Sequence, residues 1–116
     1  MSTREVPYAT GDRNDEAFES VAAYSTTTRD QVIPNGETWQ VSEFQGSAAY
    51  SPDASAKVIW DRTGTPDVLA STHGDATFIL TRNCAGDGTK KLSIVLDNQT
   101  ANEQLLGGKY IATRVI

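Results

Sequence analysis

The sequence predicts an all-β fold, an antiparallel β-sandwich or jelly roll of about six or seven strands. Apolar residues recur with a period near two, turn signals separate the short apolar stretches, and no stretch has the spacing of an amphipathic helix. A sheet with one apolar face needs a second layer to cover it, so strands of this kind pack as two sheets.

Alternation is clearest at residues 90–98, KKLSIVLDN, where Leu92, Ile94 and Leu96 share one face of the expected strand. The stretch GDGTK at residues 86–90 precedes it. Its two glycines can adopt positive φ angles, so they predict a tight reversal from a preceding strand at residues 76–83.

Upstream, a Pro-Asn-Gly turn signal at residues 34–36 opens a strand that ends near residue 44. Trp39 and Val41 share a face while Phe44 is out of phase, so we expect a bulge or the strand's end near Glu43. Further strands are expected at residues 56–62, 67–72 and 107–116. Residues 17–28 permit a helical turn, but their Tyr, Val and Thr content favours a strand. The predicted core consists of Trp39, Phe44, Val58, Trp60, Leu69, Phe78, Leu80, Leu92, Ile94, Leu96, Tyr110 and Val115.

Length and composition predict one domain with a polar N-terminal arm at residues 1–16 and the sandwich at residues 17–116. The net charge of −5 repels a phosphate backbone, so no direct nucleic-acid partner is expected. No apolar run approaches the roughly 18 residues of a membrane helix, and the start lacks the apolar stretch of a signal peptide. A soluble protein made in a cytosol, with no membrane partner, is the expectation.

Few side chains are suited to catalysis. Ser71, His73 and Asp75 supply the residue types of a nucleophile–base–acid triad, but residues so close on one turn rarely form its hydrogen-bond relay. Cys84 is the only cysteine, which excludes an internal disulfide and favours a small core or loop residue. We therefore expect no catalytic residue and no enzymatic activity.

Metal and cofactor sites are not expected either. One His and one Cys are too few for a zinc site. Calcium would need carboxylates from several loops to meet at one end of the sandwich, and turn aspartates usually cap nearby backbone amides instead; the aspartates in question are Asp53, Asp61, Asp67, Asp75 and Asp87. The stretch GDGTKK lacks the glycine spacing of a phosphate-binding loop.

Aromatic residues offer a binding site as the alternative. On a β-sandwich such rings can stack against sugars, which would make the chain a carbohydrate-binding module with glycans as ligands; the rings in question are Trp39, Trp60, Tyr24, Tyr50 and Tyr110. Both tryptophans are in phase with apolar faces and fit the core better. Tyr50, in the loop GSAAYSPDAS, is the aromatic residue we expect to be exposed.

Residues 32–116, and especially the stretches IPNGETWQV, KVIWDRTGT, LASTHGD, GDGTKKLSIVLDN and GGKYIA, resemble the small β-sandwich and jelly-roll virion proteins of tailed bacteriophages. The resemblance rests on the rhythm of the strands and brings no functional residue with it. It implies a non-enzymatic structural subunit of a virus particle, such as a head decoration, neck or tail accessory protein. Such a subunit is made in the host cytoplasm, resides in the virion, and contacts copies of itself and other virion proteins.

A physical argument independent of the resemblance also favours association. The last strand, KYIATRVI, ends without a run of charges, and an exposed sheet edge must be blocked by charges or covered by a partner. We expect this edge or the arm to pack on another subunit. Tyr50, Tyr110 and Ile116 are the candidate contacts to a ligand or partner.

Overall fold

The structure is a computed structural model that describes residues 12–116. It contains strands and no helix within these residues, which confirms the all-β prediction. The strands are β1 (Asp15–Val21), β2 (Ser25–Val32), β3 (Thr38–Ser47), β4 (Ala54–Trp60), β5 (Asp67–Thr72), β6 (Ala76–Ala85), β7 (Lys91–Asn98) and β8 (Gln104–Arg114). The count is higher than predicted because residues 17–28 form parts of two strands, separated by a turn in which Tyr24 has a φ of 54°.

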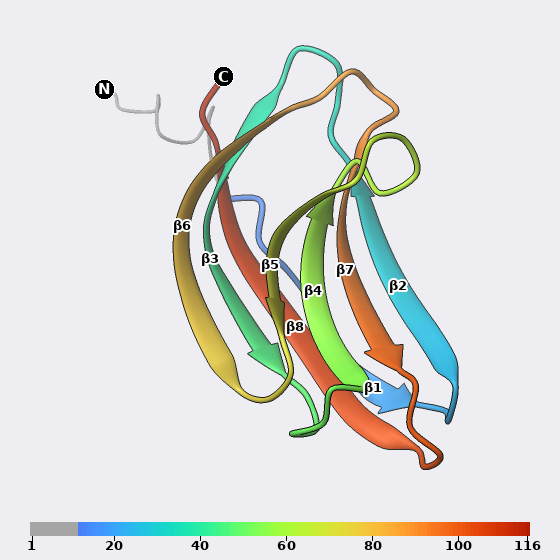
Figure 1. Ribbon diagram of the computed structural model, residues 1–116. Coiled ribbons are helices and arrows are strands. Elements are labelled where there is room, and N and C mark those ends of the chain that lie inside the picture. Colours follow the sequence, from blue (N-terminus) through green and yellow to red (C-terminus); the bar gives the residue numbers. More distant parts are fainter. Residues whose placement is uncertain (1–11) are drawn as a thin grey trace.

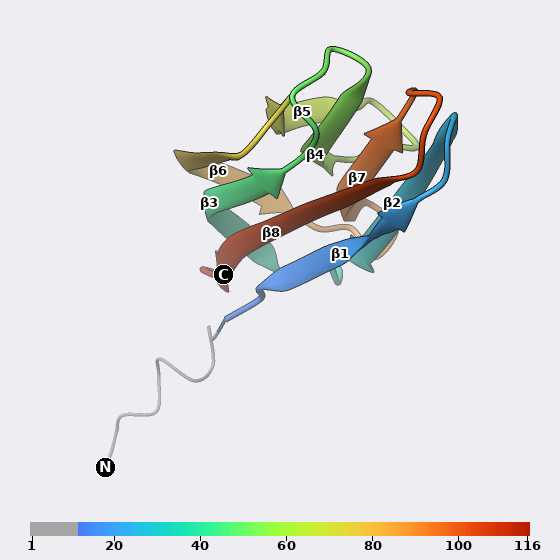
Figure 2. The same cartoon turned by 90° about the horizontal axis from the view of Figure 1, so that it is seen from below.

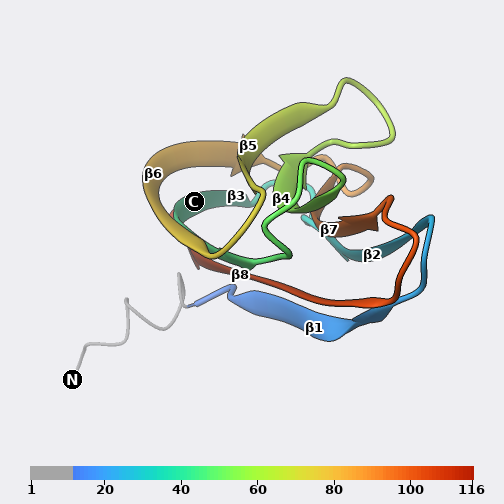
Figure 3. The same ribbon diagram turned by 60° about the horizontal axis from the view of Figure 1, so that its bottom comes forward.

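The strands form two four-stranded antiparallel sheets that pack as a sandwich (Figures 1 and 2). Sheet A has the order β1-β8-β3-β6, and sheet B has the order β2-β7-β4-β5. The two layers are also separate in the tilted view of Figure 3. Only β4 and β5 are both consecutive in sequence and paired within one sheet; every other connection crosses between the sheets.

Alternating side chains from both sheets fill the space between them. Seven predicted core residues are buried, and four more pack against the core while partly exposed; the buried ones are Trp39, Phe44, Val58, Leu92, Ile94, Leu96 and Tyr110, and the partly exposed ones are Trp60, Leu69, Phe78 and Leu80. The prediction that Val115 belongs to the core is wrong, because Val115 follows the end of β8 and is 40% exposed.

Two local predictions upstream of β6 are confirmed. The amide of Glu37 donates to the carbonyl of Pro34 at 3.1 Å, and Gly36 has a φ of 88°, as a type II turn requires. The pairing register of β3 shifts between Val41 and Glu43, which is the expected bulge.

The predicted reversal at residues 86–90 is wrong, because β6 belongs to sheet A and β7 to sheet B. The turn instead bonds to the connection between β2 and β3. Gly86 N–H donates to the carbonyl of Glu37 at 2.8 Å, and Gly88 N–H donates to that of Ile33 at 3.1 Å. The glycine turn therefore guides the chain from one layer to the other.

The last strand is not an edge strand, contrary to our expectation. β8 lies between β1 and β3, and the edge strands are β1 and β6 in sheet A and β2 and β5 in sheet B. The predicted arm also ends earlier than residue 16, because Asp15 and Glu16 belong to β1 and Asp12 forms a bridge with Thr113. Residues 1–11 of that arm lie outside the described residues. Within residues 12–116 no helix is long and apolar enough to cross a membrane.

The connections alternate between the two ends of the sandwich. Residues 22–24, 48–53, 73–75 and 99–103 form what we call the loop end, at the bottom of Figure 1. Residues 33–37, 61–66, 86–90 and the C-terminal residues 115–116 form the opposite end.

Candidate binding site at the loop end

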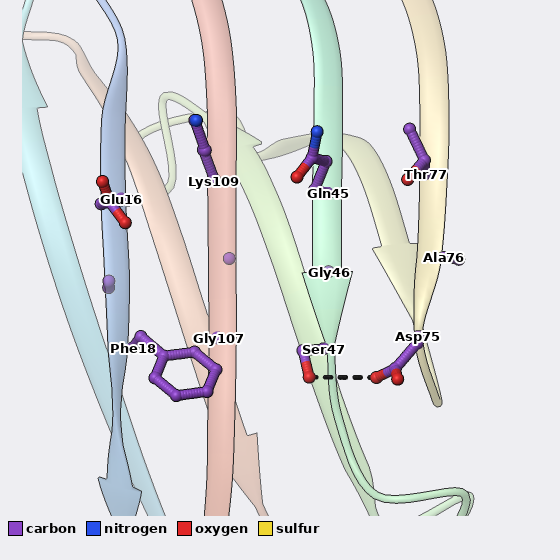
Figure 4. Close-up of a pocket in the computed structure, with 12 residues that line it drawn as sticks. Glu16, Phe18, Gln45, Gly46, Ser47, Asp75, Ala76, Thr77, Gly107 and Lys109 are labelled. Atoms are coloured by element: carbon purple, nitrogen blue, oxygen red, sulfur yellow. Dashed lines mark hydrogen bonds between the residues drawn. The ribbon is translucent and has the colours of Figure 1, made fainter.

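A pocket of about 380 Å³ lies on the outer face of sheet A and extends over all four of its strands (Figure 4). Its side chains come from alternate positions that point away from the core. They are aromatic, polar and charged, and include Phe18, Ser47, Asp75, Glu16 and Lys109.

One row of the sheet forms the half of the pocket nearest the loop end. Phe18 on β1 pairs with Gly107 on β8, and Gly107 pairs with Ser47 on β3. A Cβ atom at Gly107 would collide with the ring of Phe18, so the missing side chain allows the ring to lie over β8. The ring nevertheless remains 61% exposed. It forms a flat apolar wall that faces solvent.

The charged groups of the pocket have no ion-pair partner among the described residues. Asp75 accepts a hydrogen bond from Ser47 Oγ at 3.0 Å through Oδ1. Glu16 and Lys109 are opposite each other in the next row. In Figure 4 the side chain of Lys109 points away from the row that holds Phe18 and Asp75. In the half of the pocket nearest the loop end, the carboxylate of Asp75 is therefore the charged group that faces a ligand.

Exposed aromatic rings gather at the loop end. Phe18 is the central residue of β1, Tyr24 lies in the turn after β1, and Tyr50 lies in the loop after β3; their side chains are 61%, 67% and 82% exposed. The ring of Tyr50 lies over Gly74, where a Cβ would also collide with it. Tyrosine and other aromatic side chains are enriched at protein interfaces because they supply a large rigid contact area.

The same end is acidic. The segments 18–26, 47–55, 71–76 and 97–106 contain no Lys or Arg and five carboxylates: Glu19, Asp53, Asp75, Asp97 and Glu103. None of these carboxylates forms an ion pair with another described residue. The loop end thus presents uncompensated negative charge next to its aromatic rings.

Asn98, which is fully buried at the end of β7, connects the two loops nearest β1. Its amide nitrogen donates to the carbonyls of Val21 at 2.9 Å, Ala22 at 3.2 Å and Asn102 at 2.8 Å. Its amide oxygen accepts hydrogen bonds from the backbone amide and hydroxyl of Thr100. One buried side chain therefore holds the turn after β1 against the loop after β7.

The other two loops continue this network. The amide of Gln99 donates to the carbonyl of Asp53 at 2.7 Å, which joins the loop after β7 to the loop after β3. Nδ1 of His73 donates to the carbonyl of Ala54 at 2.7 Å and joins the turn after β5. All four loops are therefore connected by hydrogen bonds, which order the backbone that carries Tyr24 and Tyr50.

The candidate contact residues do not lie together. Tyr50 is exposed at the loop end, as predicted. Tyr110 is fully buried in the core, so it cannot contact a ligand or partner as predicted. Burial also raises the pKa of its phenol. Ile116 is 69% exposed at the opposite end, where its carbonyl accepts hydrogen bonds from the amide of Thr38 and Nε of Arg114.

The residues considered for catalysis are hydrogen-bonded to other groups or buried. The side chain of His73 is hydrogen-bonded to the carbonyl of Ala54, and that of Asp75 to the hydroxyl of Ser47, so these two hydrogen bonds do not join His73 to Asp75. Cys84 is buried, and desolvation raises the pKa of its thiol to about 12, which keeps it protonated.

The loop aspartates considered for calcium separate between the two ends. Asp53 and Asp75 are at the loop end, whereas Asp61 and Asp87 are in connections at the opposite end. Within residues 12–116 no group of three or more His, Cys, Asp or Glu side chains could hold a metal ion.

The five aromatic rings considered for the alternative carbohydrate platform do not gather on one surface. Trp39 and Tyr110 are buried, and Trp60 is partly buried against the core. Only Tyr24 and Tyr50 of the five rings are exposed. Phe18 was missed, although its position between Ala17 and Glu19, out of phase with the buried Ala17 and Val21, is a signal that it faces outward.

No protein-family model matches this sequence, and no curated protein matches it. Among solved structures, the chain is similar to a periplasmic inhibitor of g-type lysozyme, PliG, from Aeromonas hydrophila. The sequences are 19% identical, the match covers 89% of this chain and 88% of that chain, and the TM-score is 0.49.

The virion function and the virion location inferred from the bacteriophage resemblance are corrected here, since the similar structure is a periplasmic inhibitor and not a virion protein. Contacts with copies of the chain or with other virion proteins are not tested by this comparison. The virion interpretation is withdrawn, and the burial of Trp39 and Tyr110 argues against its carbohydrate-binding alternative.

Proposed function

We propose that this chain is a non-catalytic protein-recognition module that binds a basic partner protein through its loop end. The observation that carries the proposal is that three exposed aromatic rings, and five carboxylates with no ion pair among the described residues, lie on the four connected loops or on the strands next to them. Aromatic anchors supply most of the binding energy in typical interfaces, and opposite charges increase the rate of association.

Rigidity supports the same role. A binding surface that is ordered in advance loses less conformational entropy when the partner arrives. The hydrogen bonds of Asn98, Gln99 and His73 order the loops that carry Tyr24 and Tyr50. The engaged His73 and the protonated Cys84 thiol support a role without catalysis.

The test measures binding of the full chain to a panel of purified, strongly basic proteins, with acidic proteins of similar size as controls. The panel includes a g-type lysozyme, so that this partner is tested directly and not assumed from the structural similarity. We expect at least one basic protein to bind, with an affinity that decreases as salt is added.

Two pairs of variants locate the surface. A Tyr24→Ala, Tyr50→Ala double variant should weaken binding by at least about 30-fold, since the loss of even one hot-spot residue costs roughly 2 kcal/mol or more. The matched control replaces Val68 and Ile79 by alanine; both are exposed but lie outside the loop end, so affinity should be unchanged. Glu103→Gln should slow association, whereas Asp12→Asn, exposed near the opposite end, should not.

Three results would overturn the proposal: no basic protein binds, the tyrosine double variant binds as tightly as the wild type, or binding does not depend on salt. A defined ligand on a glycan array that Tyr50→Ala abolishes would also overturn it, because the partner would then be a sugar.

A further inference from the structure

The half of the pocket nearest the loop end has a chemistry that the proposed function does not yet use. An exposed ring stands at one side, a carboxylate at the other, and a glycine and a serine lie between them; in order across the sheet these are Phe18, Gly107, Ser47 and Asp75. We propose that this row receives one arginine side chain of the basic partner. The inference rests on the proposed function and names the group that the partner inserts.

The spacing fits an arginine. Neighbouring strands are about 4.8 Å apart, so Gly107, over which the ring lies, and Asp75 are roughly 10 Å apart across β3. The side chain of Asp75 approaches Ser47 to 3.0 Å, which shortens the gap that a ligand must bridge. An extended arginine lies with its methylene groups against the Phe18 ring, which covers Gly107, and with its guanidinium at the carboxylate of Asp75.

Charge and shape favour a guanidinium. One oxygen of Asp75 accepts the bond from Ser47, and the other has no partner among the described residues, so the carboxylate can receive a charged N–H donor. The exposed face of the Phe18 ring attracts a cation, and a planar guanidinium also stacks on it. Lys109, which would repel a cation, points away from this row in Figure 4.

Ser47 acts as a positioning residue for this carboxylate. Its hydroxyl holds Asp75 Oδ1 and thereby fixes the orientation of the second oxygen. Gly107 allows the ring to lie flat, because any side chain there would displace it. The row therefore depends on the absence of a side chain at Gly107 and on the hydroxyl group of Ser47.

The test titrates the isotope-labelled chain with N-acetyl-arginine amide and follows its backbone amide resonances by NMR. We expect saturable shifts at Ser47, Asp75 and Gly107. N-acetyl-citrulline amide has nearly the same shape without the charge and should bind about tenfold more weakly, as should N-acetyl-lysine amide, which lacks the planar group.

Variants assign the binding to the row. Asp75→Asn keeps the shape of the side chain and should weaken binding of the arginine amide about tenfold, whereas Asp53→Asn, an exposed loop-end carboxylate outside the pocket, should not. Phe18→Leu should weaken it by a smaller factor, since it removes only the aromatic face. An unchanged spectrum away from the substitution shows that each variant is folded.

The inference is overturned if no saturable shift occurs in the row, if citrulline or lysine amide binds as well as arginine amide, or if Asp75→Asn has no effect. The outcome is independent of the protein-binding test. Loss of protein binding with intact arginine-amide binding removes only the proposed function, and the reverse result removes only this inference.

Discussion

The two ends of the sandwich differ in how many of their charged side chains form ion pairs within the chain. At the opposite end Glu37 lies 3.8 Å from Arg13 and 3.7 Å from Arg114, and Arg62 reaches back to Asp30 on β2 at 2.8 Å. At the loop end the carboxylates have no ion pair with any described residue. Because the opposite end forms several ion pairs within the chain and the loop end forms none among the described residues, the loop end is the surface that a basic partner protein can complement in charge.

The two ends also differ in what holds their loops. A neutral buried amide, Asn98, organises the loop end. Charged hydrogen bonds contribute more at the opposite end, where Nε of Arg62 donates to Asp30 at 2.9 Å and Nε1 of Trp39 donates to Glu37 at 2.9 Å. Substitutions at the two ends should therefore respond differently to pH.

The largest expected effect is at the loop end, where Asn98→Ala should lower the free energy of unfolding by about 2–4 kcal/mol. The substitution leaves the carbonyl of Val21 without its buried donor and the backbone amide of Thr100 without the side-chain oxygen to which it donates. Urea denaturation at neutral pH measures the change. Asn102→Ala is the control, since Asn102 contributes only its backbone carbonyl to this network; equal losses in both variants would contradict the role given to Asn98.

A smaller and pH-dependent effect is expected at the opposite end for Asp30→Asn. Hydrogen bonds from Arg62 hold the pKa of Asp30 at about 2, below its ordinary value of 3.8, and Ser93 adds a further bond to the same carboxylate. Because the pKa is lower in the folded state, this stabilisation is present above pH 4 and is lost as the pH falls towards 2.

Asp30→Asn should therefore cost about 1 kcal/mol at pH 7, after allowance for solvent screening, and the difference from the wild type should shrink below pH 4. Urea denaturation at several pH values measures it. Asp53→Asn at the loop end has no ion pair to lose and should follow the wild type. A deficit for Asp30→Asn that stays constant with pH would contradict the mechanism.

The smallest expected effect is a gain in stability. Tyr24 has a φ of 54°, a left-handed conformation that is unfavourable for a bulky residue, and its ring is 67% exposed, so little packing is lost on replacement. Asparagine tolerates this conformation, and Tyr24→Asn should add about 0.5–1 kcal/mol to the free energy of unfolding. Tyr50→Asn, without a positive φ to relieve, should show no gain in the same denaturation experiment. A loss in Tyr24→Asn would show that the ring supports the fold.

Most of the fold that could be predicted from the sequence is local. The alternation of Leu92, Ile94 and Leu96 and the turn at Gly36 depend only on neighbouring residues, and both were predicted correctly. The partner of each strand was not predictable in this way. Residues 86–90 have the chemistry of a reversal, but the same glycines also serve a crossing between layers.

The candidate site depended even more on pairing between distant segments. Exposure of Tyr50 followed from its polar loop. The contact between Phe18 and Gly107 joins residues from opposite ends of the sequence, and it exists only because β1 pairs with β8. No local pattern at residue 18 contains that information.

The crossing of nearly every connection between the sheets also has a kinetic consequence. Apart from β4 and β5, no strand can form its backbone hydrogen bonds with the strand that immediately follows it, so most pairing must wait until distant parts of the chain have met. Closing those long loops costs entropy before any pairing is gained, which places such a topology among the slow folders, in the range of milliseconds to seconds. The newly made chain therefore leaves its strand edges unpaired for longer than a protein built from hairpins would.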